Sequence, residues 1–170
     1  NVIADFTKRR ELIRTAILAE GVKLNANTVV DESLLDEVTG LVEYPVALTG
    51  KFDKLFLEVP SEALTLAMKS HQKCFYLLNN EEDLLPYFVT VSNIRSNDPS
   101  QVTKGNERVI RPRLADAKFF YETDKQASLE SRLNQLKKVV FQKKLGTVYD
   151  RSLRVANLAK FIAIDTGQNE

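Results

Sequence analysis

The sequence predicts an α+β fold, in which a small and mostly antiparallel sheet packs with helices and further C-terminal helices follow. Stretches with apolar residues three and four positions apart alternate with short runs rich in β-branched and aromatic residues. Two of these short runs, 74–78 and 87–92, are joined by a polar NNEED turn that allows antiparallel pairing. The 170 residues, 44% of them hydrophobic, suffice for a real core.

Composition narrows the classes of function. The chain carries 24 Lys and Arg against 23 Asp and Glu, so any affinity for nucleic acid must come from local clusters of cations. Cys74 is the only cysteine, which excludes an intramolecular disulfide and a multi-cysteine zinc site. No run reaches the ~18 apolar residues of a membrane span, and the opening residues are charged where a signal peptide is apolar. We therefore expect a cytoplasmic protein that has no membrane partner.

Two amphipathic helices are expected first. Asp5 can cap a helix over 6–20, and Gly21 supplies a natural stop. The apolar stripe of this helix consists of Leu12, Ile13, Ala16, Ile17 and Ala19. Its opposite face carries Lys8, Arg9, Arg10 and Arg14, which either touch a partner or form an ordinary solvated surface. Asp31 then caps a second helix over 32–43.

A strand, a helix and a hairpin follow. The segment PVALTGKF, residues 45–52, predicts a strand with Pro45 at its first position. A helix begins at Ser61 and extends to Lys73. Its predicted buried residues are Leu64, Ala67 and Met68. The strands of the NNEED hairpin then complete the sheet.

The stretch from Lys104 to Tyr121 separates its charges from its apolar residues, after a helix start expected at Asp98–Pro99. Basic residues at helical spacing would share one face: Lys104, Arg108, Arg111 and Lys118. Apolar residues at the same spacing would form a buried face: Ile110, Leu114, Ala117 and Tyr121. Because proline lacks an N–H and clashes with the preceding turn, Pro112 is expected to kink or break the helix near Arg111.

The end of the chain is predicted to be helical throughout. Ser128 caps a helix over 128–144, and a last amphipathic helix follows Gly146. We therefore divide the chain into an α+β domain, 1–125, and a helical segment, 126–170.

The enzyme signatures that are easiest to recognise are missing from the sequence. It has no phosphate-binding GxxxxGK loop, no GxGxxG, no HExxH, no GxSxG and no paired-cysteine motif. His71 and Cys74 lie three residues apart, but no third group is evident to orient them as base and nucleophile. We therefore predict no catalytic residue, no metal site and no cofactor within the chain.

Two basic clusters suit RNA. The segment MKSHQK supplies the donors Lys69, His71, Gln72 and Lys73, and the stretch 104–121 supplies the second cluster. Such residues would give salt-dependent binding to the backbone with little sequence discrimination. The alternative is a solvated face balanced by acidic neighbours such as Glu107 and Asp116.

Four segments carry a family resemblance. They are EVTGLVEYPVALTGKFDKLFLEVPSEALTLAMKSHQKCF (37–75), LLPYFVTVSNI (84–94), GNERVIRPRLADAKFFYETD (105–124) and VVFQKKLGTVYDRSLRV (139–155). On these segments the chain resembles the β subunit of the bacterial tetrameric glycyl-tRNA synthetase, although Cys74 departs from the aromatic residue of that family. The resemblance implies an α2β2 enzyme that attaches glycine to tRNA(Gly) using ATP. It also implies two partners, tRNA(Gly) and the α subunit, which carries the catalytic core.

The same resemblance implies that the chain is an internal fragment of that subunit. Residues 1–125 would be similar to the B3/B4 domain of the phenylalanyl-tRNA synthetase β subunit. Residues 126–170 would begin an HD-like helical region, but its metal site cannot be carried over, because this chain has no His-Asp pair.

We expect a non-catalytic domain that either binds tRNA or acts as a scaffold. The candidate tRNA contacts are Lys69, His71, Lys73, Lys104, Arg108, Arg111 and Arg113. In the scaffold alternative the domain packs on the α subunit or on the rest of the β subunit, with Arg111 and Arg113 buried against carboxylates. A more distant alternative, an editing-type hydrolase, is suggested by the B3/B4 likeness alone.

Overall fold

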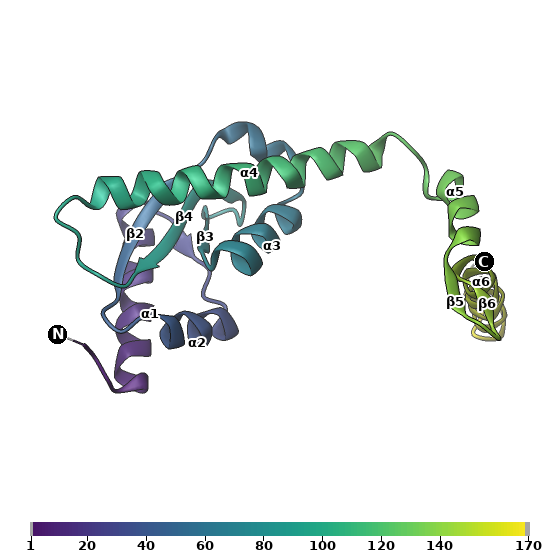
Figure 1. Cartoon of the computed structure of the whole chain (residues 1–170), viewed down its shortest axis with the longest axis horizontal. Helices are drawn as coiled ribbons and strands as arrows, with labels where there is room; N and C mark the ends of the chain where they lie inside the picture. The colour runs from purple at the N-terminus through teal and green to yellow at the C-terminus, as the bar shows by residue number, and fades with distance from the viewer. Residues whose placement is uncertain (1, 169–170) are drawn as a thin grey trace. The chain divides into compact units, whose positions relative to one another are not determined.

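The structure is a computed structural model that describes residues 2–168. It divides into two compact units, Asn1–Tyr121 and Glu122–Glu170, which we call unit 1 and unit 2 and describe separately. Unit 1 holds a four-stranded antiparallel sheet with helices packed on it, so the predicted α+β class is confirmed. Figure 1 shows α4 running along one side of the strands of unit 1.

The elements of unit 1 alternate between helix and strand. In chain order they are α1 (Phe6–Lys23), β1 (Asn27–Thr28), α2 (Glu32–Leu41), β2 (Val46–Lys51), the 3-10 helix η1 (Lys54–Glu58), α3 (Ser61–Gln72), β3 (Phe75–Leu78), β4 (Leu84–Ser92) and α4 (Pro99–Lys125). The last turn of α4, after Tyr121, is counted in unit 2. The strand order is β1-β3-β4-β2, with every neighbouring pair antiparallel. The predicted NNEED hairpin, β3–β4, therefore forms the centre of the sheet.

Each face of the sheet buries its own core because side chains alternate along a strand. On β4, Val89 enters a cluster with residues of α1 and α2, whereas Phe88 enters a second cluster with residues of α3 and α4. The second cluster contains Leu64, Ala67 and Met68, as the sequence predicted. Helices α1 and α2 thus cover one face, and α3 and α4 cover the other.

Helix α1 differs from its prediction at its end and on both faces. Leu12 and Ala19, two residues of the expected apolar stripe, are exposed. Gly21 does not end the helix, which continues to Lys23. A Cβ at Gly21 would lie 2.4 Å from the Thr28 hydroxyl oxygen, so glycine is needed there for the close approach of β1. Arg9, expected on the solvated face, is buried and donates from Nε to the Thr39 carbonyl at 3.0 Å. The helix is therefore rotated so that Arg9 belongs to the buried face.

Helix α4 is continuous from Pro99 to Lys125 with Pro112 inside it, so a break near Arg111 is wrong and the other expected outcome, a kink, stays a prediction. The buried residues Ile110 and Leu114 lie on either side of the proline and anchor the helix on the second core cluster. Arg108 and Pro112 are exposed, so water can satisfy the carbonyl that the proline leaves without a donor.

Unit 2 is only partly helical. Its elements are α5 (Leu129–Arg132), the 3-10 helix η2 (Leu133–Lys138), β5 (Val140–Gln142), β6 (Gly146–Thr147) and α6 (Val148–Asp165). The helix predicted over 128–144 is wrong beyond its first turns, because the β-branched and aromatic residues after Lys138 pair as an antiparallel hairpin. The predicted last helix is confirmed as α6, which starts at a capping box between Thr147 and Asp150.

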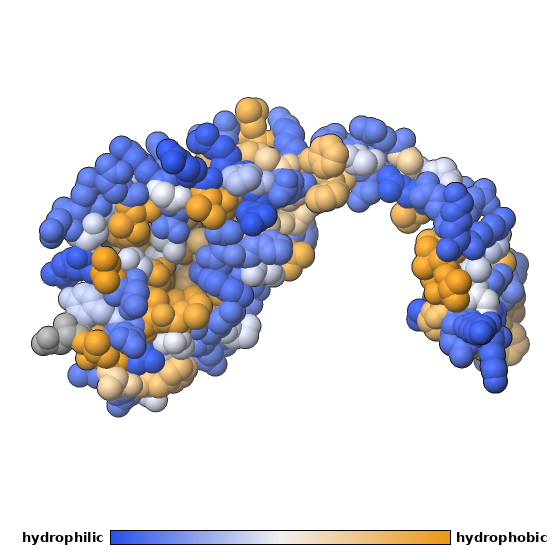
Figure 2. Space-filling model, in the orientation of Figure 1, coloured by the Kyte–Doolittle hydropathy of each residue, from blue (hydrophilic) through white to orange (hydrophobic). Residues whose placement is uncertain are grey.

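No described residue of unit 2 is buried, although its last helix is amphipathic. The large exposed hydrophobic residues of α6 are Leu153, Val155, Leu158, Phe161, Ile162 and Ile164. Figure 2 shows hydrophobic residues gathered on the surface of this unit. The likeness of unit 2 to an HD region and of unit 1 to a B3/B4 domain stays a prediction.

Candidate nucleic-acid interface

The solvent-facing side of α4 carries three cations at helical spacing. Burial of Ile110 and Leu114, 1% and 0% exposed, directs this helix face to the core. Lys104, Arg108 and Arg111 are consequently exposed, and Figure 2 shows hydrophilic residues over the first turns of the helix. Neither arginine forms a hydrogen bond or an ion pair with another residue in the described part of the chain. We call these three residues the α4 cation row.

Two carboxylates close to the α4 cation row already have partners. Glu107 accepts a hydrogen bond from the Lys51 backbone N–H at 3.0 Å, which connects α4 to the end of β2. The pKa of Asp98 lies below its ordinary value, first because the Ser100 hydroxyl donates to it, with a smaller contribution from the charge of Lys104. The α4 cation row therefore faces solvent, and the acids beside it are already hydrogen-bonded to the Lys51 backbone and to Ser100 at the helix start.

The other basic residues of α4 are less available than the row. Arg113 is exposed and approaches Asp116 at 4.0 Å, within the same helix. Lys118 pairs with Glu58 of η1 at 2.7 Å. Lys118, predicted to share the basic face, therefore joins α4 to η1 instead.

The basic residues of α3 are divided between two roles. Lys69 forms an ion pair with Asp31, and Lys73 forms one with Glu37 at 2.8 Å, so both lysines bind the acidic helix α2. The hydrogen bond from Lys69 is the largest cause of the lowered pKa of Asp31, followed by the bond from Ser33. His71 is exposed at the end of the helix. The structure thus gives the two lysines an intramolecular role that sequence spacing did not reveal.

The arginines of α1 also meet α2. Arg10 pairs with Glu32 and Asp36, both at 2.5 Å, and Arg14 pairs with Glu32 at 2.6 Å. The cation-rich face of α1 is therefore matched by the acids in the segment ESLLDE. That acidic segment was the signal in the sequence, but only the tertiary packing brings the two helices together.

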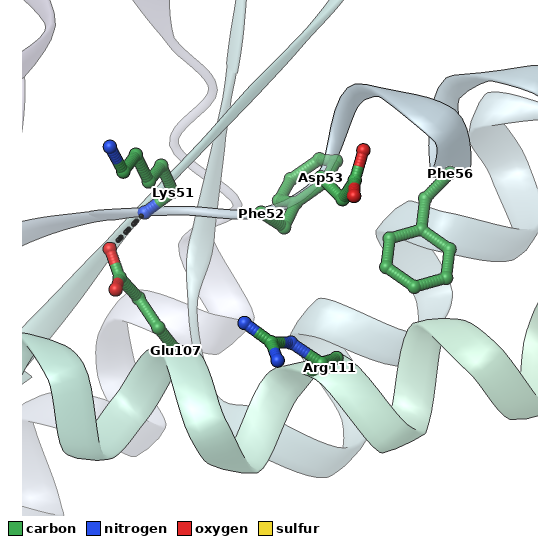
Figure 3. A pocket seen from close by; sticks show the side chains of 6 residues that line it. All are labelled: Lys51, Phe52, Asp53, Phe56, Glu107 and Arg111. Carbon is green, nitrogen blue, oxygen red and sulfur yellow. Dashed lines mark hydrogen bonds between the residues drawn. The ribbon is translucent and has the colours of Figure 1, made fainter.

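A small hollow lies beside the α4 cation row, between α4 and the segment that joins β2 to η1. It is lined by Lys51, Phe52, Asp53, Phe56, Glu107 and Arg111. Figure 3 shows Arg111 pointing from α4 toward this segment, and the ring of Phe56 pointing back toward the helix. Sequence reasoning identified Arg111 but missed the segment KFDKLF, in which aromatic residues alternate with charged ones. Aromatic and basic residues side by side are typical of surfaces that bind single-stranded nucleic acid.

The described residues hold no cluster of metal ligands, and the one cysteine among them is buried. No group of three or more His, Cys, Asp or Glu side chains in 2–168 could hold a metal ion. Burial raises the pKa of the Cys74 thiol to about 12, so this cysteine is not a nucleophile at neutral pH. In the same described range, every helix is too short or too polar to cross a bilayer.

Comparison with known proteins agrees with the resemblance seen in the sequence. The family model described as glycyl-tRNA synthetase beta subunit matches residues 1–170. Similar relatives include the glycine–tRNA ligase beta subunits of Marinobacter nauticus, 56% identical over 95% of this chain, and of Chromohalobacter salexigens, 56% identical over 98%. The corresponding subunit of Hahella chejuensis is 53% identical over 99% of the chain. The chain spans about a quarter of their length, 24% in each case. With its whole length matched, the chain belongs to the glycyl-tRNA synthetase beta subunit family.

Proposed function

We propose that this chain is a non-catalytic tRNA-binding part of a glycine–tRNA ligase. The complete enzyme would attach glycine to tRNA(Gly) with ATP in the cytoplasm, and an α subunit would supply the catalytic core. Family membership supports the activity of the whole enzyme. The described residues hold no metal cluster and the thiol of Cys74 is not activated, which fits a binding role better than the editing alternative.

The α4 cation row is the single observation that carries the tRNA-binding role. Arg108 and Arg111 are exposed and have no carboxylate partner among the described residues. An unpaired guanidinium can donate two parallel hydrogen bonds to a phosphate without first giving up an ion pair. These arginines and Lys104 would hold the tRNA backbone in position and make no contribution to bond formation.

The remaining candidates rank below the row. His71 is an exposed donor, and Arg113 is exposed with a distant acid in its own helix. Lys69 and Lys73 would have to give up their bonds to α2 before contacting a phosphate. We therefore assign these four residues at most a secondary share of the tRNA contact.

A salt titration of tRNA binding to the complete enzyme tests the proposal. We expect Arg108→Ala/Arg111→Ala to weaken tRNA binding, measured by fluorescence anisotropy. The slope of log affinity against log salt should become shallower by about 1–2, because two phosphate contacts are lost. Lys69→Ala/Lys73→Ala removes the same charge from the ion-paired lysines and should leave the slope unchanged. Equal slopes for both double variants and the wild type would reject the assignment.

A scaffold role is the second candidate, and one observation favours it. Phe119 and Phe120 of α4 are 65% and 63% exposed and pack edge to face, with ring centroids 5.6 Å apart. Exposed aromatic pairs are common at protein interfaces. In that case Phe119→Ala/Phe120→Ala should weaken assembly of the α and β subunits in analytical ultracentrifugation, whereas the double arginine variant should leave tRNA binding unchanged.

A further inference from the structure

The hollow beside Arg111 brings together two phenyl rings, a guanidinium and two carboxylates, and Lys51 lines its edge with its ammonium group directed away from Arg111 (Figure 3). We propose that this hollow binds one unpaired guanine base of an RNA strand. This inference rests on the proposed RNA-facing role of α4 and adds a base-specific contact to the phosphate contacts of the cation row.

The charged groups of the hollow keep free hydrogen-bonding capacity. Asp53 uses Oδ1 to accept the Leu55 N–H at 3.0 Å, at the start of η1, and Glu107 uses Oε1 to accept the Lys51 N–H. Each carboxylate is thus fixed through one oxygen and has a second oxygen available. Arg111 pairs with neither acid nor with any other described residue. Its guanidinium and the two free oxygens therefore offer donors and acceptors to one ligand.

The two rings supply a fixed apolar wall. Phe52 and Phe56 are half-buried and pack against the second core cluster, so the core holds their positions. Base stacking on such aromatic rings is a general mode of binding single-stranded RNA. The hollow has a volume of about 230 Å³, below the roughly 300 Å³ at the lower end of ordinary ligand pockets. One base fits this scale better than a base pair does.

The mixture of charges selects guanine among the bases. Guanine presents two acceptors, O6 and N7, that match an arginine fork, and its N1–H and N2–H groups can donate to a carboxylate. Adenine places its N6 donor next to N7, so it would direct a donor at Arg111. An acidic peptide would meet the charges of Asp53 and Glu107, and a cation would meet Arg111. An uncharged planar group with acceptors on one edge and donors on another matches the hollow.

The test uses the complete enzyme and fluorescein-labelled seven-nucleotide RNAs that differ only in the central base. We expect the guanine strand to bind about tenfold more tightly than the adenine strand in fluorescence anisotropy, the size of one good base contact. Inosine, which lacks the N2 amino group, and 7-deazaguanine, which lacks N7, should each lose most of that preference. Phe56→Leu keeps an apolar side chain in the core but removes the ring, and should weaken guanine binding about tenfold.

Asp53→Asn removes the carboxylate but leaves the fold intact, because asparagine also caps a helix start. It should abolish the preference for guanine and leave the adenine strand unaffected. The matched controls on α4 are Asp116→Asn and Phe119→Leu, which should preserve the preference.

Equal binding of all four strands, with no effect of Phe56→Leu, would overturn the guanine site and leave the phosphate contacts of Arg108 standing. Free GMP that binds as tightly as the guanine strand would overturn the RNA assignment in favour of a mononucleotide ligand.

Discussion

Helices α3 and α4 both pack on the second core cluster of unit 1 and both carry cations at helical spacing, yet those cations have different surroundings. On α3, Lys69 and Lys73 bind carboxylates of α2. On α4, Arg108 and Arg111 form no ion pair with a carboxylate of the described residues, although Asp53 and Glu107 share the hollow with Arg111. The difference lies in what the neighbouring carboxylates bind. The acids of α2 and its cap pair with Lys69 and Lys73, whereas the acids beside α4 bind Lys118 or backbone N–H groups.

The lysines of α3 thus stabilise the fold, whereas the arginines of α4 are free to bind an anionic ligand. A partly buried ion pair commits a lysine to one geometry, and a phosphate must then compete with the protein's own carboxylate. An exposed arginine without a partner costs the fold little when it is replaced. Replacing the ion-paired lysines of α3 should therefore lower stability and change tRNA affinity little. Replacing the unpaired arginines of α4 should lower tRNA affinity and change stability little.

The largest expected effect concerns what holds α4 in place. Leu114 is fully buried and anchors the helix in the second core cluster. Leu114→Ala should lower the free energy of unfolding by about 2–5 kcal/mol, the sum of lost burial and a residual cavity. Because the chain has no tryptophan, urea denaturation of the 170-residue chain is best followed by circular dichroism at helical wavelengths.

Leu66→Ala is the matched control on α3, since this leucine is 63% exposed. It should change the free energy of unfolding by less than about 0.5 kcal/mol. A similar loss in the two variants would mean that α4 is not held by its apolar face. Burial of that face would then no longer explain why the α4 cation row points to solvent.

A smaller effect is expected at Asp31, which serves α2 and α3 together. It caps α2 by accepting from Ser33 and Leu34, and it pairs with Lys69. Asp31→Ala should lower the free energy of unfolding by about 1–2 kcal/mol, mostly through the lost cap. Asp31→Asn keeps the cap and should lower the free energy of unfolding by less. Denaturation of the three proteins at pH 7 gives the comparison.

The pH dependence of this effect has a definite sign. The pKa of Asp31 is lowered in the folded chain, first by the hydrogen bond from Lys69, whereas an unfolded aspartate titrates near about 3.9. The carboxylate therefore stabilises the fold above that pH, and the stabilisation is lost progressively as the pH falls further. The advantage of the wild type over Asp31→Asn should shrink below about pH 4. A constant advantage down to pH 2 would contradict the role of the ion pair.

Local sequence patterns predict most of the helices and strands of unit 1 but fewer of those of unit 2. Asp31 followed by an amphipathic run predicts α2, and the NNEED turn predicts the central hairpin; both depend on neighbouring residues. The segment after Lys138 was predicted as a helix, but it pairs with β6, a partner that periodicity does not reveal. Pro112 predicts a kink or a break, but α4 is not broken there, because burial on both sides of the proline outweighs the lost hydrogen bond.

The candidate site could also be predicted only in part, because some of its contacts join residues that are distant in the sequence. Helical spacing correctly placed Lys104, Arg108 and Arg111 on one exposed side of α4. Spacing treated Lys69 and Lys73 as equivalent candidates, because their acidic partners lie on α2, more than thirty residues earlier. Phe52 and Phe56 join Arg111 only once η1 packs against α4, so the hollow depends on tertiary structure.

The smallest expected effect is the coupling between Lys73 and Glu37, and it tests the division between the two helices most directly. Their side chains are 36% and 46% exposed and pair at 2.8 Å. A double-mutant cycle with alanine should give a coupling energy of about 0.2–1 kcal/mol, and added salt should reduce it. The control is Lys104→Ala, which should change the free energy of unfolding by less than about 0.5 kcal/mol. Zero coupling, together with a loss of tRNA affinity on Lys73→Ala as large as that on Arg108→Ala, would extend the RNA-facing role to α3 and remove the division between the two helices.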